Sequence, residues 1–173
     1  MKLDEIKPIF IINEIFDTKI PVESWTHDGN ESIGALMVDG AEFRIKLEHL
    51  FYQVKTLPRK EFINVTFAKS VNGEWSEKLT LDGKGASKIL GAIMHAVIDE
   101  LSNHKYDAIV FAATDNVDRR MHIYNSLAWK IMKRFNDYTV LEDVPFNGGK
   151  LTILIPLGHA KNELEAIKAA IQK

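Results

Sequence analysis

The stretch from Asp82 to Phe135 constrains the fold of this chain most, because its pattern passes from loop to helix to strand to helix without a break. A glycine-containing loop, Asp82 to Ser87, leads into an amphipathic helix that we expect to end near Asn103. The uninterrupted apolar run Ala108 to Ala113 is typical of a strand covered on both faces. A second helix is expected over about residues 117–135. This unit places a helix N-terminus, which attracts anions, beside a buried strand.

Both predicted helices carry an apolar stripe at helical spacing. In the first helix the stripe consists of Ala86, Ile89, Leu90, Ile93, Met94, Val97 and Leu101. In the second helix the residues expected to face inward are Met121, Tyr124, Ala128, Ile131, Met132 and Phe135. The residues expected to face outward form a basic set, Arg119, Arg120, Lys130, Lys133 and Arg134. Such a set is most often a solvated helix face, and its functional alternative is a patch for phosphate or an acidic partner.

The chain before this unit is predicted to be antiparallel sheet. Its predicted strands cover residues 32–38, 41–47, 62–69 and 74–81. The dipeptides Asp39-Gly40 and Asn72-Gly73 are hairpin-turn signals between them. Residues 17–31 have the composition of a loop, and residues 9–16 fit a helix and a strand equally.

After the unit, residues 138–144 and 151–157 are expected to form a last hairpin through Asn147 to Gly149. Residues 160–172, rich in Ala, Glu and Lys, are expected to form a closing surface helix. Strands, then helix–strand–helix, then a hairpin predict an α+β fold: a mixed, mostly antiparallel sheet with helices on both faces. A length of 173 residues predicts one domain over residues 1–173.

Composition excludes several classes of protein. A net charge of −2 argues against a nucleic-acid partner. No run of eighteen apolar residues is present, and Met1 to Glu5 is acidic where a signal peptide is basic, so we expect a cytoplasmic protein without a membrane partner. Exposed sheet edges make a homodimer a candidate assembly.

The side chains that most often bind metals or act as nucleophiles are absent or scattered. The chain has no cysteine, which excludes disulfides, zinc ribbons and thiol nucleophiles. The six histidines show neither metal-ligand spacing nor a serine or aspartate at a recognisable nucleophile elbow. We therefore expect neither a metal site nor a Ser-His-Asp triad.

The loop Asp82 to Ser87 and the helix it opens resemble the GCN5-related N-acetyltransferase (GNAT) superfamily. The resemblance implies that this loop binds the pyrophosphate of acetyl-CoA. The implied cofactor-binding residues are Gly83, Lys84, Gly85, Ala86 and Ser87. Small residues let the backbone approach the pyrophosphate, and the helix N-terminus supplies positive potential. Asp82 departs from the family, which usually has a cation or an amide there.

The segment Tyr124 to Trp129 resembles the Tyr-x-x-Leu-Gly-Phe motif of the same superfamily. By this resemblance, Tyr124 is the general acid that protonates the departing CoA thiolate. Asn116 resembles the asparagine that contacts the pantetheine arm, and Arg119 and Arg120 lie near a CoA phosphate. Residues 118–135 are also similar to GNAT-like proteins of bacteriophages. Considered alone, Tyr124 and the loop glycines would be a core-edge tyrosine and turn glycines.

The implied activity is an acyl-CoA-dependent N-acyltransferase, with acetyl-CoA as donor, no metal, and an amine as acceptor. Its general base is not unique in the sequence, because Glu74, Glu77 and Asp115 are all placed to serve. The acceptor itself remains open. The alternative is a GNAT-like protein that is catalytically inactive and serves as a binding or assembly module. Asp82 and the unusual N-terminal third favour that alternative.

Overall fold

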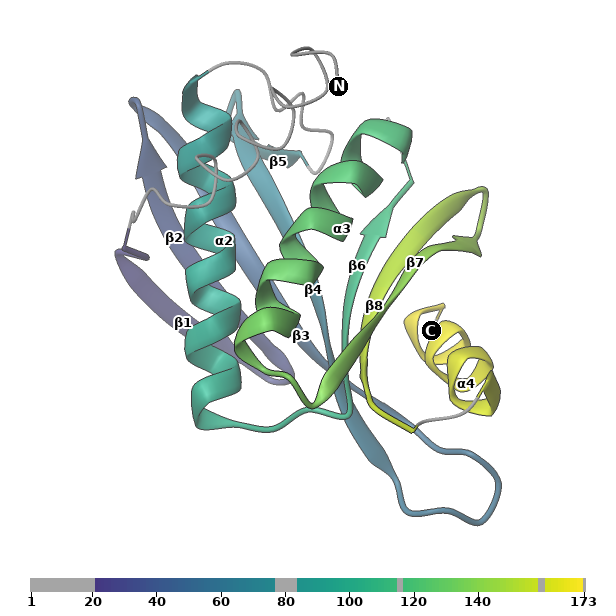
Figure 1. The fold of residues 1–173 in the computed structure, drawn as a ribbon. Coiled ribbons are helices and arrows are strands. Elements are labelled where there is room, and N and C mark those ends of the chain that lie inside the picture. Colours follow the sequence, from purple (N-terminus) through teal and green to yellow (C-terminus); the bar gives the residue numbers. More distant parts are fainter. Residues whose placement is uncertain (1–20, 77–83, 115–116, 159–160, 173) are drawn as a thin grey trace, which may run out of the picture.

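The computed structural model describes residues 21–76, 84–114, 117–158 and 161–172, which form an α+β structure (Figure 1). Its helices are α2 (Lys84–Asn103), α3 (Val117–Arg134) and α4 (Lys161–Ile171). Its strands are β1 (Ser24–Asp28), β2 (Glu31–Val38), β3 (Ala41–Tyr52), β4 (Lys60–Val71), β5 (Glu74–Ser76), β6 (Ala108–Ala113), β7 (Tyr138–Phe146) and β8 (Gly149–Pro156). All of these strands belong to one sheet.

The sheet has the strand order β1-β2-β3-β4-β6-β8-β7, and β5 pairs with β4 outside this path. Neighbouring strands run antiparallel except β4 and β6, which are parallel. A parallel pair needs a long crossover connection, and the connection between β4 and β6 contains α2. The predicted mixed, mostly antiparallel sheet is therefore confirmed.

Tight turns join most of the antiparallel strands. In three hairpins two successive turn residues have positive φ, the geometry that matches the twist of the flanking strands. These pairs are Asp39 (51°) with Gly40 (78°), Asn72 (52°) with Gly73 (82°), and Asn147 (46°) with Gly148 (76°). The three predicted hairpin turns are confirmed.

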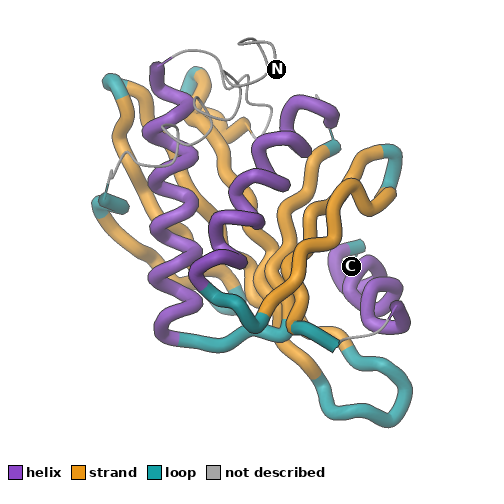
Figure 2. Tube along the Cα trace, in the orientation of Figure 1, coloured by secondary structure: helices purple, strands orange, loops and turns teal. Residues whose placement is uncertain are grey.

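Helices cover both faces of the sheet, with α2 and α3 on one face and α4 on the other (Figure 2). Side chains of β6 alternate between the two resulting cores. Ile109 and Phe111 belong to the core under α2 and α3, whereas Ala108 and Val110 belong to the core under α4. This alternation explains why the sequence of β6 is apolar throughout.

Two strands differ most from expectation. Residues 24–28, within a segment expected to be loop, form β1, which pairs with β2 from Ser24↔Ala35 to Asp28↔Glu31. All five side chains of β1 are exposed, so the apolar alternation that would reveal a strand is absent. The strand predicted over 41–47 continues to Tyr52. Residues 9–16 and 77–81 lie outside the described residues.

Within the described ranges, no helix combines the length and the hydropathy needed to cross a bilayer.

A buried ion pair fixes α4 to the sheet. Glu163, in the first turn of α4, is only 6% exposed and pairs with Nζ of Lys60 at the start of β4. Its other carboxylate oxygen accepts a hydrogen bond of 3.3 Å from the Tyr52 hydroxyl. Burial, and then the negative charge of Glu163, raise the pKa of Tyr52 above its usual range, so this hydroxyl stays a donor.

Replacing Glu163 with alanine is expected to destabilise the protein, because the Lys60 ammonium then remains at a mostly buried position without this carboxylate. The expected loss in the free energy of unfolding is about 3 kcal/mol, measured by urea denaturation. Glu165→Ala is the matched control, since Glu165 is an exposed partner of Lys168 in the same helix, and it should change stability by less than about 0.5 kcal/mol. Equal losses in the two variants would contradict this role for Glu163.

Candidate functional site

The parallel strands β4 and β6 pair along only part of their length. Their pairing runs from Phe62↔Ala108 to Val65↔Phe111 and then stops, although β4 continues to Val71. Further along, Lys69 pairs with β3 on one side and with Ser76 of β5 on the other. Strand β5 therefore lies on the same edge of β4 as β6 does. Between these two registers, over residues 66–68, no described strand pairs with this edge.

An open cavity of about 1080 Å³ lies where this pairing stops. Its wall combines side chains from the middle of β4, the β4–β5 hairpin, the end of β6 and the first turn of α3. The polar and aromatic residues that line it are Asn64, Thr66, Asn72, Glu74, Trp75, Ser76, Thr114, Arg120 and Phe146. The cavity is thus built at a gap in the sheet.

Asn64 places a buried polar group in the wall of this cavity. The residue is 7% exposed, and its amide nitrogen donates a hydrogen bond of 3.4 Å to Oε2 of Glu48. Because a carboxylate can only accept hydrogen bonds, the amide atom that faces Glu48 is the nitrogen. The orientation of the amide is thereby fixed. The amide oxygen of Asn64 is buried and has no hydrogen-bond partner among the described residues. A buried acceptor in this state costs about 1–3 kcal/mol.

Arg120 brings a positive charge to the same cavity. Its side chain is 7% exposed, and its guanidinium carbon lies 6.0 Å from the centre of the Phe67 ring. The expectation that Arg120 faces outward is therefore wrong. Arg120 precedes Tyr124 by four residues, so the two share one side of α3 and Arg120 extends the inward stripe to the helix start. Lys133 and Arg134 are exposed, as expected for the basic face.

Tyr124 lies in the core next to the cavity. It is 4% exposed, stacks on Phe111 of β6 with ring centres 5.6 Å apart, and meets Phe67 of β4 edge-on at 6.1 Å. Phe67 therefore contacts both Tyr124 and Arg120. Tyr124 itself is not among the residues that line the cavity.

The structure brings some of the other predicted site residues together. Glu74 is exposed and lines the same cavity as Arg120. Residues 84–87 form the first turn of α2, and Arg119 lies in the first turn of α3, but the positions of their side chains are not described. Outside the described residues lie Glu77, Asp82, Gly83, Asp115 and Asn116.

Asn64, Thr66, Trp75 and Thr114 are among the lining residues that the sequence did not predict as site residues. A signal for the first two exists in the sequence, because Asn64 and Thr66 are polar positions two apart within residues 62–68 of β4, which are otherwise apolar. They face away from α2 and α3, whereas Ile63, Val65 and Phe67 belong to the core under those helices. Trp75 gives no such signal, because it lies in an exposed hairpin.

A second polar cluster lies at the opposite end of β4, around Glu61. His49, His104 and the backbone of Asp107 all contact Glu61, although these residues are far apart in the sequence. The histidine spacing gave no reason to expect this cluster, because it is assembled by strand pairing and by the turn after α2.

Replacing Asn64 with leucine tests whether its amide oxygen is unsatisfied in the folded protein. The change removes a buried acceptor at nearly constant volume and loses only the long 3.4 Å bond to the half-buried Glu48, so the free energy of unfolding is expected to rise by about 1 kcal/mol. Urea denaturation measures it. Asn103→Leu is the control, because Asn103 is exposed and donates to the Asp99 carbonyl at 2.8 Å, and it should not stabilise the protein. A loss of more than 1 kcal/mol for Asn64→Leu would show that the oxygen is satisfied.

Comparison with known proteins adds no relative from which a function could be carried over. No protein family model matches the chain, and neither a curated protein nor a solved structure matches it.

Proposed function

We propose that this protein is an acyl-CoA-dependent N-acyltransferase, with acetyl-CoA as donor and an amine as acceptor. The observation that carries the proposal is the cavity at the point where the parallel strands β4 and β6 stop pairing. The resemblance to the GNAT superfamily implies a donor held where two strands splay apart, and the end of the β4–β6 pairing supports the proposal by offering such a point.

The unpaired edge of β4 suits an extended donor. Residues 66–68 pair with β3 on one side and lie between the β6 and β5 registers on the other, so the backbone groups that point away from β3 face an edge where a chain could add to the sheet. The pantetheine arm of CoA carries amides of this kind. The amide oxygen of Asn64 would accept from a donor group of the bound molecule, which removes the cost of leaving it unsatisfied.

Positive potential supports the phosphate-bearing end of the donor. Helix α2 begins at Lys84, shortly after β5 ends, and a helix N-terminus favours anions through its unpaired N–H groups and its dipole. Arg120 adds a permanent charge at the cavity wall. These two features offset the negative charge of Asp82, which precedes α2 in the sequence.

The transfer would proceed directly. The acceptor nitrogen attacks the thioester carbonyl carbon, a C–N bond forms, and the C–S bond breaks. Glu74, which lines the cavity, would take the proton from the acceptor ammonium, directly or through water. Tyr124, which lies one turn along α3 from Arg120 and outside the cavity lining, would donate its phenolic proton to the CoA thiolate through water, and the tyrosinate would take up the second proton of the acceptor nitrogen by the same route.

Binding of acetyl-CoA tests the proposal directly. At millimolar acetyl-CoA the melting temperature is expected to rise, because a ligand that binds only the folded state stabilises it. Arg120→Met should weaken binding about tenfold, or about 1.4 kcal/mol, through loss of a charged partner. Lys133→Met, which removes an exposed charge from the same helix, should bind like the unaltered protein. Absence of any thermal shift or calorimetric signal would overturn the proposal.

Tyr124→Phe separates the acid role of Tyr124 from its packing role, because phenylalanine preserves the ring contacts with Phe67 and Phe111. We expect kcat for amine acetylation to fall by about 100-fold while the KM for acetyl-CoA stays unchanged. A variant with full kcat would remove Tyr124 from the mechanism without affecting the proposed donor site.

The alternative function, an inactive binding or assembly module, is favoured by one observation. Strand β5 covers part of the β4 edge that a donor would use. The part of this edge that pairs with no described strand is therefore limited to residues 66–68. Under this alternative, Tyr124→Phe leaves function unchanged, and substitution of the exposed Lys133 and Arg134 abolishes partner binding.

A further inference from the structure

A serine, a histidine and a glutamate form a hydrogen-bonded series across three neighbouring strands, away from the cavity described above. Ser32 lies in β2, His49 in β3 and Glu61 in β4. Oγ of Ser32 is 3.4 Å from Nε2 of His49, and Nδ1 of His49 is 3.2 Å from Oε1 of Glu61. A carboxylate on one ring nitrogen and a hydroxyl on the other is the arrangement of a serine nucleophile with its base.

The surrounding hydrogen bonds fix the direction of this series. The Tyr106 hydroxyl donates to Oε1 of Glu100 at 2.5 Å, so its oxygen accepts from Nδ1 of His49 at 3.2 Å. Glu61 can only accept as well. In neutral His49 the proton therefore lies on Nδ1, and Nε2 accepts from the Ser32 hydroxyl. This is the tautomer that a general base for Ser32 requires.

Glu61 is held in place from several sides. Its second carboxylate oxygen lies 3.0 Å from Nε2 of His104. Its backbone nitrogen donates to the Asp107 carboxylate at 3.0 Å, and its carbonyl accepts from the Asp107 nitrogen at 2.8 Å. Burial, and then the hydrogen bond to Glu100, raise the pKa of the neighbouring Tyr106, which keeps that hydroxyl protonated beside His49. The histidine therefore has a defined orientation.

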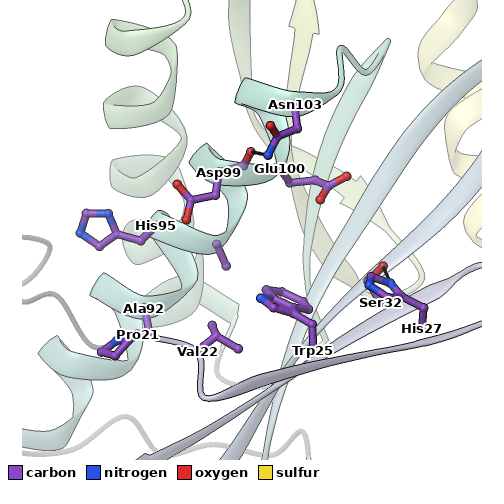
Figure 3. Close-up of a pocket in the computed structure, with 11 residues that line it drawn as sticks. Pro21, Val22, Trp25, His27, Ser32, Ala92, His95, Asp99, Glu100 and Asn103 are labelled. Carbon is purple, nitrogen blue, oxygen red and sulfur yellow. Dashed lines mark hydrogen bonds between the residues drawn. The ribbon is translucent and has the colours of Figure 1, made fainter.

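Ser32 opens onto a cavity of about 430 Å³ between α2 and the edge of the sheet (Figure 3). Trp25 and Val22 form an apolar wall, and Gly34 makes it possible, since a Cβ there would lie 2.7 Å from Val22 and 3.0 Å from the Trp25 ring. Asp99 and Glu100 line the cavity from α2. These carboxylates disfavour anionic ligands, so the cavity suits a small neutral or cationic molecule with an apolar part.

We propose that this cavity is a second catalytic site, in which Ser32 attacks small neutral or cationic carboxylic esters. Oγ of Ser32 bonds to the ester carbonyl carbon while its proton passes to Nε2 of His49. Glu61, a positioning residue, stabilises the resulting imidazolium. The C–O bond to the alcohol breaks, and the departing oxygen takes the proton from His49. Water then attacks the acyl-Ser32 ester with His49 as base, which releases the acid and restores the serine.

His27 supplies a donor for the oxyanion of each tetrahedral intermediate. Its Nδ1 lies 2.9 Å from Oγ of Ser32, and in the proposed site this nitrogen carries the proton, because Ser32 gives its own proton to His49. It lines the same cavity as Ser32. This N–H is therefore placed within reach of the carbonyl oxygen of an ester bonded to Oγ.

The test uses the full chain, a fluorophosphonate probe that reacts with activated serines, and p-nitrophenyl acetate as ester. We expect peptide mass spectrometry to find the phosphonyl group on Ser32, and Ser32→Ala to lower ester hydrolysis at least about 100-fold. Ser102→Ala is the control, since Ser102 is exposed on α2 and donates to the Ile98 carbonyl. It should retain full labelling and hydrolysis.

His49→Gln should abolish labelling, and Glu61→Gln should lower kcat for the ester without raising KM. Mapping of the label on the unaltered protein tests the proposal even where a variant fails to fold. Absence of phosphonylation at Ser32 in the folded protein, or hydrolysis by folded Ser32→Ala at the unaltered rate, would overturn it. Acetyl-CoA binding is expected to be unchanged in Ser32→Ala, because the two cavities have no lining residue in common.

Discussion

The short parallel pairing of β4 with β6 is the constraint on which the rest of the structure depends. It joins the antiparallel meander of β1 to β4 to the part of the sheet made of β6, β8 and β7. Without this pairing the two parts would be separate sheets. Parallel pairing requires a crossover, and the crossover helix α2, with α3, buries one face of the joined sheet. Because β6 is central, it must be apolar on both sides, and that requirement accounts for its sequence.

The same pairing divides the molecule into two chemically different ends. At the beginning of β4, Glu61 and Asp107 exchange backbone and side-chain hydrogen bonds, which draws the chains together and concentrates histidines and carboxylates around Glu61. Past Val65 the pairing stops, and β5 borders the gap. One end of the strand therefore carries an ordered polar network, whereas the other carries an open cavity with an unsatisfied amide oxygen.

Local signals made much of the fold predictable from the sequence. Asp39-Gly40 and Asn72-Gly73 identify hairpins because positive φ is a property of the dipeptide itself. The apolar run of β6 and the stripe of α2 are equally local. By contrast, β1 is recognised only by its pairing with β2, since its side chains are exposed. The positive charge of Arg120 predicts a side chain that faces solvent. Its spacing of four residues from Tyr124 instead places it on the buried side of α3. The Ser32, His49 and Glu61 series depends on strand register, which no single segment encodes.

The ion pair between Lys60 and Glu163 has a consequence for the order in which the chain folds. Glu163 also bonds to Tyr52, a residue 111 positions earlier, and both partners lie at the ends of the strands that flank the β3–β4 loop. Contacts between such distant positions close last, because the loop entropy is recovered only once the intervening strands are in register. Because α4 follows every described strand in the chain, we expect the core under α4 to close after the core under α2 and α3. During synthesis, the side chains of β6 and β8 that face α4 are then expected to stay open to solvent until α4 has emerged.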